Sequence, residues 1–356
     1  MYRDFRPQHK LKAAEKQAFF VMLRRLAGTH GRLPDSIMIT ENIEVEGEIR
    51  ASGGFADVRS GRYMGSLVAV KTLRVAAQDD LQKIRKQFCK EVILWSTLSH
   101  PNVLKLAGVQ GDMEKGQLVT VSEWMAHGNI MEYIKKNHVN RLDLLHGAAQ
   151  GLKYLHNAGL IHGDLKGANV LISNHTLPRA CLADFGFMTM VLDPSQPMSC
   201  STQLECSTVT FMPPELLAPS EFGIKDPVPT PQADVYAFGL VIYQVLIGEI
   251  PFRSAWQKDL GFSVVQGMRP AKPENASAVG FSGSLWDFVQ RCWDGNMRLR
   301  PKVAEVVEHL ERAAADWGGL MPPCVHAKDV TSASEEPISD SMNRCESVIL
   351  NLPWYG

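Results

Sequence analysis

A short stretch of the sequence brings together side chains suited to phosphoryl transfer. It reads His162-Gly163-Asp164-Leu165-Lys166-Gly167-Ala168-Asn169, and Asp184-Phe185-Gly186 follows further along. An aspartate can orient an attacking hydroxyl, and a lysine two residues later can neutralise the phosphoryl group in transit. The amide of Asn169 and the carboxylate of Asp184 are oxygen ligands of the kind that Mg²⁺ prefers. The spacing therefore indicates magnesium-assisted transfer of a phosphoryl group.

Two further charged residues lie where a protein core would not tolerate either one alone. Lys71 sits inside the apolar run 67–73, and Glu91 lies at the edge of the apolar stripe of a predicted helix. A charge buried without a partner costs several kcal/mol, so each residue needs one. Together they predict an ion pair whose ammonium group lies beside the small-residue turn 51–54, an arrangement that suits a phosphate clamp.

The elements that must position these residues change in type along the chain. Helical spacing near the start predicts one amphipathic helix, with an apolar face of Leu11, Ala14, Ala18, Met22 and Leu26. Strand-like patterning follows at 37–45. A hairpin comes next, with its tip at the turn 51–54 and its second strand at 67–73, and further strand-like runs lie at 103–109 and 117–122. A single helix that begins after Asp80 interrupts it, and helical patterning dominates beyond 130. The order predicts an α+β protein with two unlike lobes.

Composition narrows the function classes. The chain has 356 residues, 45% hydrophobic and 21% charged, with a net charge of -1. No global basic field is available to recruit nucleic acid. The seven cysteines are scattered and form no paired C-x-x-C motif, which disfavours zinc. The longest apolar run, 238–247, is about half a bilayer crossing and no apolar leader opens the chain, so we expect no transmembrane segment and a cytoplasmic or nuclear location.

Taken in order, the motifs resemble those of eukaryotic protein kinases, and most closely the tyrosine-kinase-like group of serine/threonine kinases. The further matching segments are Gly53-Gly54-Phe55-Ala56-Asp57-Val58, Val68-Ala69-Val70-Lys71, Met212-Pro213-Pro214-Glu215, Asp234-Val235-Tyr236-Ala237-Phe238-Gly239 and Arg300-Pro301. The resemblance implies a bilobal kinase fold, with an antiparallel β-rich small lobe that holds one long helix and a mainly helical large lobe. The implied domains are a basic N-terminal extension with the amphipathic helix at 1–40, a kinase domain at 41–313 (small lobe 41–122, hinge 123–125, large lobe 126–313) and an acidic, mostly disordered tail at 314–356.

The resemblance also implies a role for each matching residue. Lys71 would hold the α- and β-phosphates of ATP and pair with Glu91, and Asp164 would accept the proton of the substrate hydroxyl. Asn169 and Asp184 would bind Mg²⁺, while Lys166 would steady the γ-phosphate. The rest of the implied nucleotide site is Ala51, Ser52, Gly53, Gly54, Phe55, Ala56, Val58, Ala69, the gatekeeper Ser122, the hinge Glu123, Trp124 and Met125, and Leu171. The implied substrate platform is Thr208, Met212, Pro213 and Pro214, and the implied structural residues are Asp234, as a cap of local backbone, and the pair Glu215 and Arg300.

Substrate class and regulation follow from the same resemblance. Lys166 and Thr208 resemble the serine/threonine pattern, which implies transfer from Mg·ATP to Ser or Thr of proteins. Gly163 stands where many of these kinases carry the arginine that binds a phosphorylated activation segment. Without that guanidinium, we predict that activity does not depend on phosphorylation of the segment. Phosphorylation itself stays open, because the segment holds Ser199, Ser201, Thr202, Thr208 and Thr210.

Two other function classes stay open at this stage. Ala51 and Ala56 replace glycines of the phosphate loop, and methyl groups there would restrict close backbone approach. A catalytically weak or inactive pseudokinase that binds nucleotide as a scaffold would tolerate this change. The triplet His162-Gly163-Asp164 is also similar to small-molecule phosphotransferases related to aminoglycoside and choline kinases. Lys166 and the segment Pro213-Pro214-Glu215 favour a protein substrate over a small molecule.

The two ends of the chain carry opposite charge. Residues 1–32 hold eight Lys or Arg against two acidic residues, and residues 315–356 hold six acidic residues against two basic ones. The simpler expectation is an N-terminal helix packed on the kinase domain and a solvated tail. The sharper hypothesis is that the basic helix docks a protein partner or a membrane surface, or attracts the tail.

Overall fold

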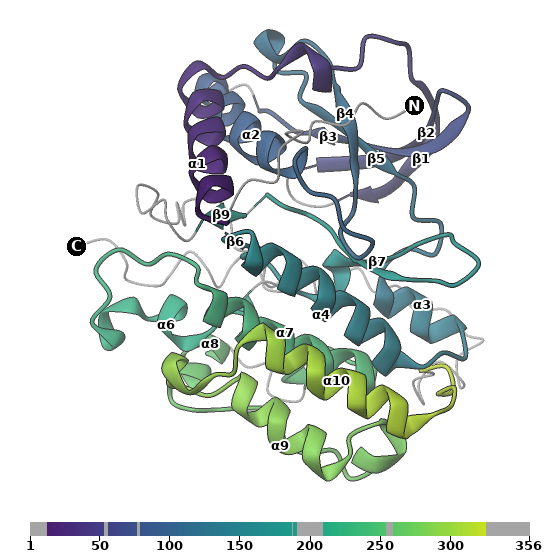
Figure 1. The fold of residues 1–356 in the computed structure, drawn as a ribbon, viewed down its shortest axis with the longest axis vertical. Helices are drawn as coiled ribbons and strands as arrows, with labels where there is room; N and C mark the ends of the chain where they lie inside the picture. Colours follow the sequence, from purple (N-terminus) through teal and green to yellow (C-terminus); the bar gives the residue numbers. More distant parts are fainter. Residues whose placement is uncertain are drawn as a thin grey trace.

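A sheet of strands forms one lobe of the protein and helices form the other (Figure 1). The computed structural model describes residues 13–52, 56–76, 79–186, 188–190, 209–253 and 259–324. The small lobe holds an antiparallel five-stranded sheet in the order β1-β2-β3-β5-β4. The strands are β1 (Glu44–Ser52), β2 (Ala56–Tyr63), β3 (Ser66–Leu73), β4 (Leu106–Gln110) and β5 (Val119–Glu123). This arrangement confirms the predicted α+β bilobal class.

Strand β2 is an element that the sequence pattern did not reveal. The predicted hairpin joined the chain before the turn 51–54 directly to the strand 67–73. In the structure β2 pairs with β1 on one side and with β3 on the other. The buried positions of β2 include Ser60 and Gly61, so the strand lacks the large apolar residues whose alternation marks a half-buried strand.

The predicted strand at 37–45 is also wrong over most of its length. A short 3₁₀ turn, η1 (Asp35–Ile37), is followed by one backbone bridge between Met38 and Val109, and β1 begins only at Glu44. Ile37, Ile39 and Ile43 are buried in the small lobe. Burial of side chains in an irregular segment produced the apolar pattern that resembled a strand.

Helix α2 (Leu81–Trp95) begins where the sequence predicts. Asp80 is its N-cap, and the carboxylate accepts a hydrogen bond from the N–H of Lys83 at 3.0 Å. Such a cap stabilises a helix start by about 1 kcal/mol. The buried face includes Phe88, Val92 and Trp95. Glu91 lies on this helix.

Helix α1 (Ala13–His30) packs alongside α2 (Figure 1). The face that it buries is not the predicted one. Met22 and Leu26, from the predicted stripe, are 53% and 50% exposed, whereas Phe20 and Ala27 are buried. The helix carries two apolar rows, and the row with the aromatic ring removes more apolar area from water. A Cβ on Gly28 would collide with the side chain of Lys90 in α2. Gly28 therefore permits a close approach of the two helices.

The large lobe is built around helix α7 (Pro231–Ile247). All of its residues from Ala233 to Leu246 except Tyr243 are buried, as expected for a helix that is apolar on every side. The surrounding helices are α3 (Ile130–Lys136), α4 (Arg141–Asn157), α6 (Pro214–Leu217), α8 (Leu260–Val265), α9 (Gly283–Cys292) and α10 (Val303–Trp317). Between the lobes, the short strand β6 (Leu160–Ile161) pairs with β9 (Thr189–Met190), and β7 (Val170–Ile172) pairs with β8 (Ala180–Leu182).

The start of the predicted tail belongs to the large lobe. Helix α10 continues to Trp317, and Met321 is 1% exposed. The backbone of Met321 exchanges two hydrogen bonds with Val139, and the N–H of Cys324 donates to the carbonyl of Ile134 at 3.0 Å. One buried methionine in a segment otherwise rich in small and polar residues gave too weak a pattern to predict this packing. Residues 325–356 lie outside the described part of the chain.

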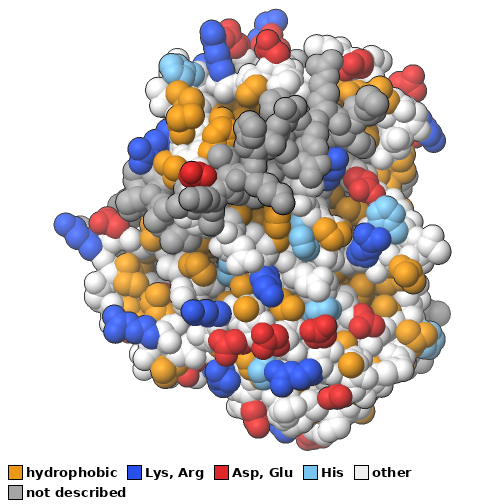
Figure 2. Space-filling view, in the orientation of Figure 1, with side chains coloured by type: hydrophobic (Ala, Val, Ile, Leu, Met, Phe, Trp, Pro, Cys, Tyr) orange, Lys and Arg blue, Asp and Glu red, His pale blue; other side chains and the backbone are white. Residues whose placement is uncertain are grey.

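The visible surface carries charge of both signs. In Figure 2 a row of acidic side chains crosses the helical lobe with Lys and Arg side chains above and below it. This mixture agrees with the net charge of -1. Within the described ranges, no helix is both long enough and apolar enough to span a bilayer.

Candidate active site

The loop between β6 and β7 forms the centre of the site. Asp164 is 7% exposed. Its Oδ2 accepts a hydrogen bond from Nδ2 of Asn169 at 2.9 Å and forms an ion pair with Nζ of Lys166 at 3.1 Å. Both contacts fall on the same carboxylate oxygen, which leaves Oδ1 for an incoming hydroxyl group. The predicted residues Asp164, Lys166 and Asn169 therefore lie within direct contact of one another.

Helix α7 anchors the start of this loop. Asp234 is 2% exposed, and its carboxylate accepts hydrogen bonds from the backbone N–H groups of His162 and Gly163, both at 2.9 Å. The ring Nε2 of His156 lies 2.8 Å from the same carboxylate. The expected cap of local backbone is wrong, because Thr230 caps α7 and Asp234 binds a segment about seventy residues earlier in the chain. Sequence reasoning did not identify His156 as a contact of Asp234.

Aromatic rings connect the loop to helix α2. His162 is fully buried, and its Nε2 donates to the carbonyl of Ala183 at 3.0 Å. Its ring lies 5.6 Å from the ring of Phe185, which in turn lies 5.4 Å from Trp95. The indole N–H of Trp95 donates to the carbonyl of Leu104 at 2.7 Å. The sequence indicated only that Trp95 was a core residue of α2, not that it belongs to this stack.

The small lobe contributes Lys71, on β3, but its partner differs from the predicted one. Nζ of Lys71 lies 2.8 Å from Oδ1 of Asp184. Lys71 and Glu91 are both described, and they do not approach within the 4.0 Å of an ion pair. Asp184 has a φ of +62°, an unusual conformation for a residue with a side chain. A Cβ on Gly186 would lie 3.7 Å from both carboxylates, so Glu91 and Asp184 approach the same place.

The electrostatics of this cluster follow from the contact between Lys71 and Asp184. Burial opposes the charge on Lys71, but the carboxylates of Asp184, Glu91 and Asp164 outweigh it and raise the pKa of the ammonium group. Burial likewise opposes the charge on Asp184, yet Lys71 lowers the pKa of its carboxyl group. Burial raises the pKa of Glu91 to about 7, which Lys71 offsets only in part and the charge of Asp184 reinforces. The carboxyl group that contacts the ammonium group is therefore the more readily ionised of the two.

A pocket beside Asp164 is lined by residues of the predicted substrate platform. Its walls include Leu165, Phe211, Met212, Pro213 and Leu216. Pro213 and Pro214 lead into α6, which begins at Pro214. Thr208 lies outside the described residues, as do Ser199, Ser201 and Thr202. Thr210 is 1% exposed, so burial argues against it as a phosphorylation site in this conformation.

Comparison with known proteins identifies the family. The profile described as protein tyrosine and serine/threonine kinase matches residues 44–310. The chain belongs to the protein kinase family. This result confirms the resemblance that the motifs showed, and the relatives below agree with the tyrosine-kinase-like group.

The chain is similar to kinases of different named specificity. It is 29% identical over 274 residues to serine/threonine-protein kinase STY46 of Arabidopsis thaliana, and the matched region covers 75% of this chain and 44% of that protein. Over 289 residues it is 30% identical to serine/threonine-protein kinase mos of Patiria pectinifera, covering 78% of this chain and 77% of that protein. Over 272 residues it is 30% identical to ephrin type-A receptor 5 of Gallus gallus, covering 73% of this chain and 25% of the receptor. The chain thus spans less than half the length of STY46 and about a quarter of the receptor.

The donor set of this kinase domain fits a magnesium ion. The pKa of Asp184 is lowered, so its carboxylate is ionised at neutral pH. Asn169 uses its Nδ2 to donate to both the carbonyl and the carboxylate of Asp164, so its amide oxygen is the atom available to a cation. A carboxylate and an amide oxygen are hard ligands that suit Mg²⁺ completed by phosphate oxygens. In the described ranges no cluster of three His, Cys, Asp or Glu side chains offers an alternative metal centre.

The predicted nucleotide residues come from strands of both lobes. Val58, Ala69 and Leu171 lie on β2, β3 and β7 and are partly exposed, as expected of side chains that line a cleft. Ser122 is 6% exposed and pairs with Ala69 across β5 and β3.

The phosphate loop and the hinge are described in part. Ala51 and Ser52 end β1, opposite Val58 and Asp57, while Gly53, Gly54 and Phe55 lie outside the described residues. Ala56 is 8% exposed, and so is Met125. The hinge carbonyl of Trp124, which follows Glu123, accepts a hydrogen bond from Nδ2 of Asn174. Sequence reasoning did not identify Asn174 as a hinge contact.

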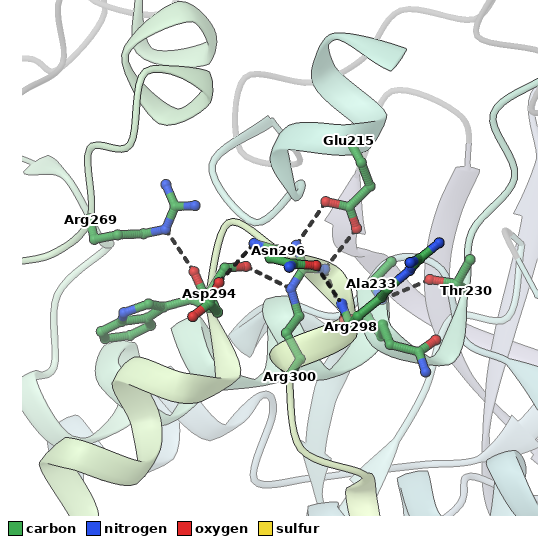
Figure 3. A network of polar contacts seen from close by, with 10 residues as sticks. Glu215, Thr230, Ala233, Arg269, Asp294, Asn296, Arg298 and Arg300 are labelled. Atoms are coloured by element: carbon green, nitrogen blue, oxygen red, sulfur yellow. Dashed lines mark hydrogen bonds and ion pairs between the residues drawn. The ribbon is translucent and has the colours of Figure 1, made fainter. Parts of the chain in front are cut away.

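A buried ion pair braces the large lobe of the kinase (Figure 3). Nη1 and Nη2 of Arg300 donate to the two carboxylate oxygens of Glu215, each at 2.7 Å. Nε of Arg300 donates to the carbonyl of Asp294 at 2.8 Å. The guanidinium carbon also lies 4.9 Å from the centre of the Tyr236 ring. Glu215 and Arg300 are therefore paired as the sequence predicted, in a bidentate geometry that fixes α6 against the segment before α10.

Proposed function

We propose that this protein is an active kinase that transfers the γ-phosphate of ATP to serine or threonine hydroxyls of proteins. The observation that carries the proposal is the arrangement at Asp164. Its Oδ2 is occupied by Lys166 and Asn169, and the carboxylate borders the pocket lined by Met212 and Pro213. Oδ2 of this carboxylate is held in place by its two contacts, and Oδ1 is left to accept a proton. A base oriented in this way beside a surface for the acceptor chain suits proton removal from a hydroxyl.

Several residues of this chain have distinct roles in the proposed reaction. Asp164 accepts the proton of the substrate hydroxyl as the hydroxyl oxygen attacks the γ-phosphorus; the bond from that phosphorus to the β–γ bridging oxygen breaks, and ADP is the leaving group. Lys166, held 3.1 Å from Asp164, balances charge on the transferred group. Lys71 binds the α- and β-phosphates from the small lobe. Mg²⁺, when held by Asn169 and Asp184, neutralises phosphate charge and orients the phosphates.

Specificity for serine and threonine is supported by Lys166 and by the names of two of the relatives. STY46 and mos are both named serine/threonine-protein kinases, and the contact of Lys166 with Asp164 is the feature of the loop that resembles their pattern. The matching family profile includes tyrosine kinases, so phosphoamino-acid analysis decides this point.

The structure of Ala56 favours activity over the pseudokinase alternative. Its side chain is 8% exposed, so the methyl group that replaces a glycine hydrogen is largely covered by protein. The charged residues Lys71, Glu91, Asp164 and Asp184 are all present and near one another. The pseudokinase and the small-molecule phosphotransferase are alternative outcomes of the phosphate-transfer experiment described below.

Independence from activation-segment phosphorylation is part of the proposal. Gly163 has a φ of +82°, which glycine adopts without strain, and its N–H is already held by Asp234. The ring stack of Trp95, Phe185 and His162 joins α2 to the catalytic loop. Both features hold the loop in place through groups that need no phosphate.

The N-terminal helix has a role that we assign first to the kinase domain itself. α1 buries Phe20, Arg24 and Ala27, which leaves only its opposite face, with Met22 and Leu26, for the docking of a partner or a membrane surface. We propose that α1 chiefly stabilises α2. Deletion of residues 1–32 should then lower the melting temperature and activity together, whereas loss of partner or membrane binding at full activity would support the docking role.

Phosphate transfer by the purified full chain tests the proposed function. Wild type is incubated with labelled Mg·ATP and a generic basic protein, beside Asp164→Asn and an exposed control, Asp287→Asn on α9. We expect label on serine or threonine, unchanged in the control and reduced about 10²- to 10⁴-fold in Asp164→Asn. Nucleotide binding without transfer would replace the proposal with the pseudokinase, and transfer to amino alcohols alone would replace it with a small-molecule phosphotransferase.

A further inference from the structure

Helix α7 carries a buried amide that the catalytic geometry does not yet explain. Gln244 is 6% exposed, in a helix whose neighbours are hydrophobic core. An amide that leaves water must find hydrogen-bond partners in the protein, because burial without them costs free energy. The partner of Gln244 therefore shows what the side chain is there to hold.

That partner is the backbone of the catalytic loop. The N–H of Gly167 donates to Oε1 of Gln244 at 3.0 Å, in a buried hydrogen bond. Gly167 is the first residue of the 3₁₀ turn η3 (Gly167–Asn169). The N–H groups in the first turn of a helix have no acceptor within that helix. Gln244 thus satisfies a donor that the loop cannot satisfy by itself.

The absence of a side chain on Gly167 makes this contact fit. A Cβ at residue 167 would lie 2.5 Å from Oε1 of Gln244 and 2.8 Å from Cγ of Met131. Both distances are shorter than non-bonded carbon contacts allow. A larger residue at 167 would therefore displace the amide, so the glycine and the glutamine are matched to each other.

The contact lies at the opposite end of the loop from the Asp234 anchor. Asp234 binds the two N–H groups that precede Asp164, whereas Gln244 binds the N–H that follows Lys166. Within the loop, the N–H of Asn169 donates to the carbonyl of Lys166 at 2.9 Å, and its Nδ2 donates to the carbonyl of Asp164 at 2.8 Å. The segment that bears Asp164 and Lys166 is thereby attached at both ends to one buried helix, and Asn169 is joined to it through the turn that begins at Gly167.

We propose that Gln244 is a positioning residue of this kinase, which fixes Lys166 and Asn169 through the backbone of Gly167. The inference rests on the proposed function, because it concerns the same phosphate transfer. Misplacement of reacting groups by about 1 Å can lower a rate about 10²-fold. Since Asn169 is the residue that supplies the amide oxygen for Mg²⁺, a loosened turn should also weaken the response to Mg²⁺.

The experiment compares Gln244→Leu with Gln244→Glu in the full chain. Gln244→Leu removes the acceptor, and we expect kcat to fall about 10- to 100-fold, with the KM for ATP within about threefold of wild type. The Mg²⁺ concentration that gives half-maximal activity should rise about three- to tenfold. Gln244→Glu keeps an oxygen acceptor at the same place and should retain kcat within about threefold of wild type.

A matched control lies on the same helix. The hydroxyl of Tyr236 is buried, and the described residues offer it no hydrogen-bond partner. Tyr236→Phe should leave kcat and the Mg²⁺ response unchanged. Gly167→Ala approaches the contact from the other side and should reproduce the kinetic defect of Gln244→Leu.

The outcomes separate this inference from the proposed function. A folded Gln244→Leu with the kcat and Mg²⁺ response of wild type would overturn the inference, as would a Gln244→Glu as impaired as Gln244→Leu. If wild type itself transfers no phosphate, the proposed function fails. The Mg²⁺ concentration that gives half-maximal binding of a non-hydrolysable ATP analogue then tests the inference on its own, and it should rise about three- to tenfold for Gln244→Leu but not for Tyr236→Phe.

Discussion

The large-lobe half of the active site, which is the catalytic loop, is held mainly by hydrogen bonds between buried groups, whereas the small-lobe half, centred on Lys71, is held by charge. Asp164 and Asp234 are 7% and 2% exposed, and each accepts several directed contacts. Lys71 and Asp184 have side chains 33% and 40% exposed, joined by one ion pair. Hydrogen bonds fix direction as well as distance, and an ion pair in partial contact with water fixes neither strongly. The difference indicates a prearranged catalytic loop opposite an adjustable phosphate clamp.

Removal of the Asp234 carboxylate should break the large-lobe half and have the largest effect. Asp234→Ala leaves the N–H groups of His162 and Gly163 and the ring of His156 without their acceptor. Unsatisfied buried donors cost about 1–3 kcal/mol each, so we expect about 3–5 kcal/mol of lost stability. At about 2–4 °C per kcal/mol, the melting temperature should fall by roughly 10 °C. Calorimetry measures this, with Asp287→Ala as an exposed control; a fall of only a degree or two would refute the hydrogen-bonded half.

Removal of the Lys71 ammonium group should affect rate far more than stability. The pair with Asp184 is more than one third exposed on the aspartate side, and such pairs contribute about 0–1 kcal/mol to folding. Loss of a preorganised charge from a phosphate site lowers rates about 10²- to 10³-fold. We therefore expect Lys71→Met to keep its melting temperature within a few degrees of wild type while losing activity by that factor. Equal losses in Lys71→Met and Asp234→Ala on both measurements would remove the contrast between the halves.

The sequence predicted the residues that meet at the catalytic loop because their chemistry is carried by local spacing. Asp164, Lys166 and Asn169 are separated by only a few positions, so the turn that joins them brings them together whatever the rest of the chain does. The start of α2 at Asp80 was predictable for the same reason, since an N-cap acts within one helical turn. The fold class followed from the order of strand-like and helical periods.

The parts that escaped prediction depend on distant segments. Gln244 lies 77 residues after the loop that it binds, and Asp234 lies 72 residues after His162. Periodicity shows that α7 is buried but not which polar group on it meets which backbone. The buried face of α1 was likewise undetermined, because two apolar rows were available and only packing against α2 selects one. The pairing of Lys71 with Asp184 depends on where the segments that carry Asp184 and Glu91 lie relative to β3, which a motif does not reveal.

The pH dependence of stability should sharpen the description of the small-lobe half. The pKa of Glu91 is raised from 4.5 to about 7 in the folded chain, so the folded state binds this proton more tightly than the unfolded state. The resulting stability is fully present below about pH 4.5 and is lost as the pH rises towards 7. The stability of wild type relative to Glu91→Gln should therefore fall between about pH 4.5 and about pH 7 and stay constant at higher pH. Melting temperatures of both proteins from about pH 5 to about pH 8 measure the difference, and a constant difference would contradict the buried, titrating carboxyl group.

The smallest effect is expected from dephosphorylation, which tests whether the large-lobe half needs an added charge. Gly163 supplies an N–H to Asp234 and no cation, so a phosphate on the activation segment would lack the arginine that usually binds it. Phosphatase treatment of purified wild type should change kcat by less than about twofold, since the loop is already held by Asp234 and by the ring of Phe185. Mass spectrometry before and after treatment confirms removal of phosphate. Loss of most turnover would mean that hydrogen bonds alone do not prearrange the loop, and that some other cation of the protein takes the place of the missing guanidinium.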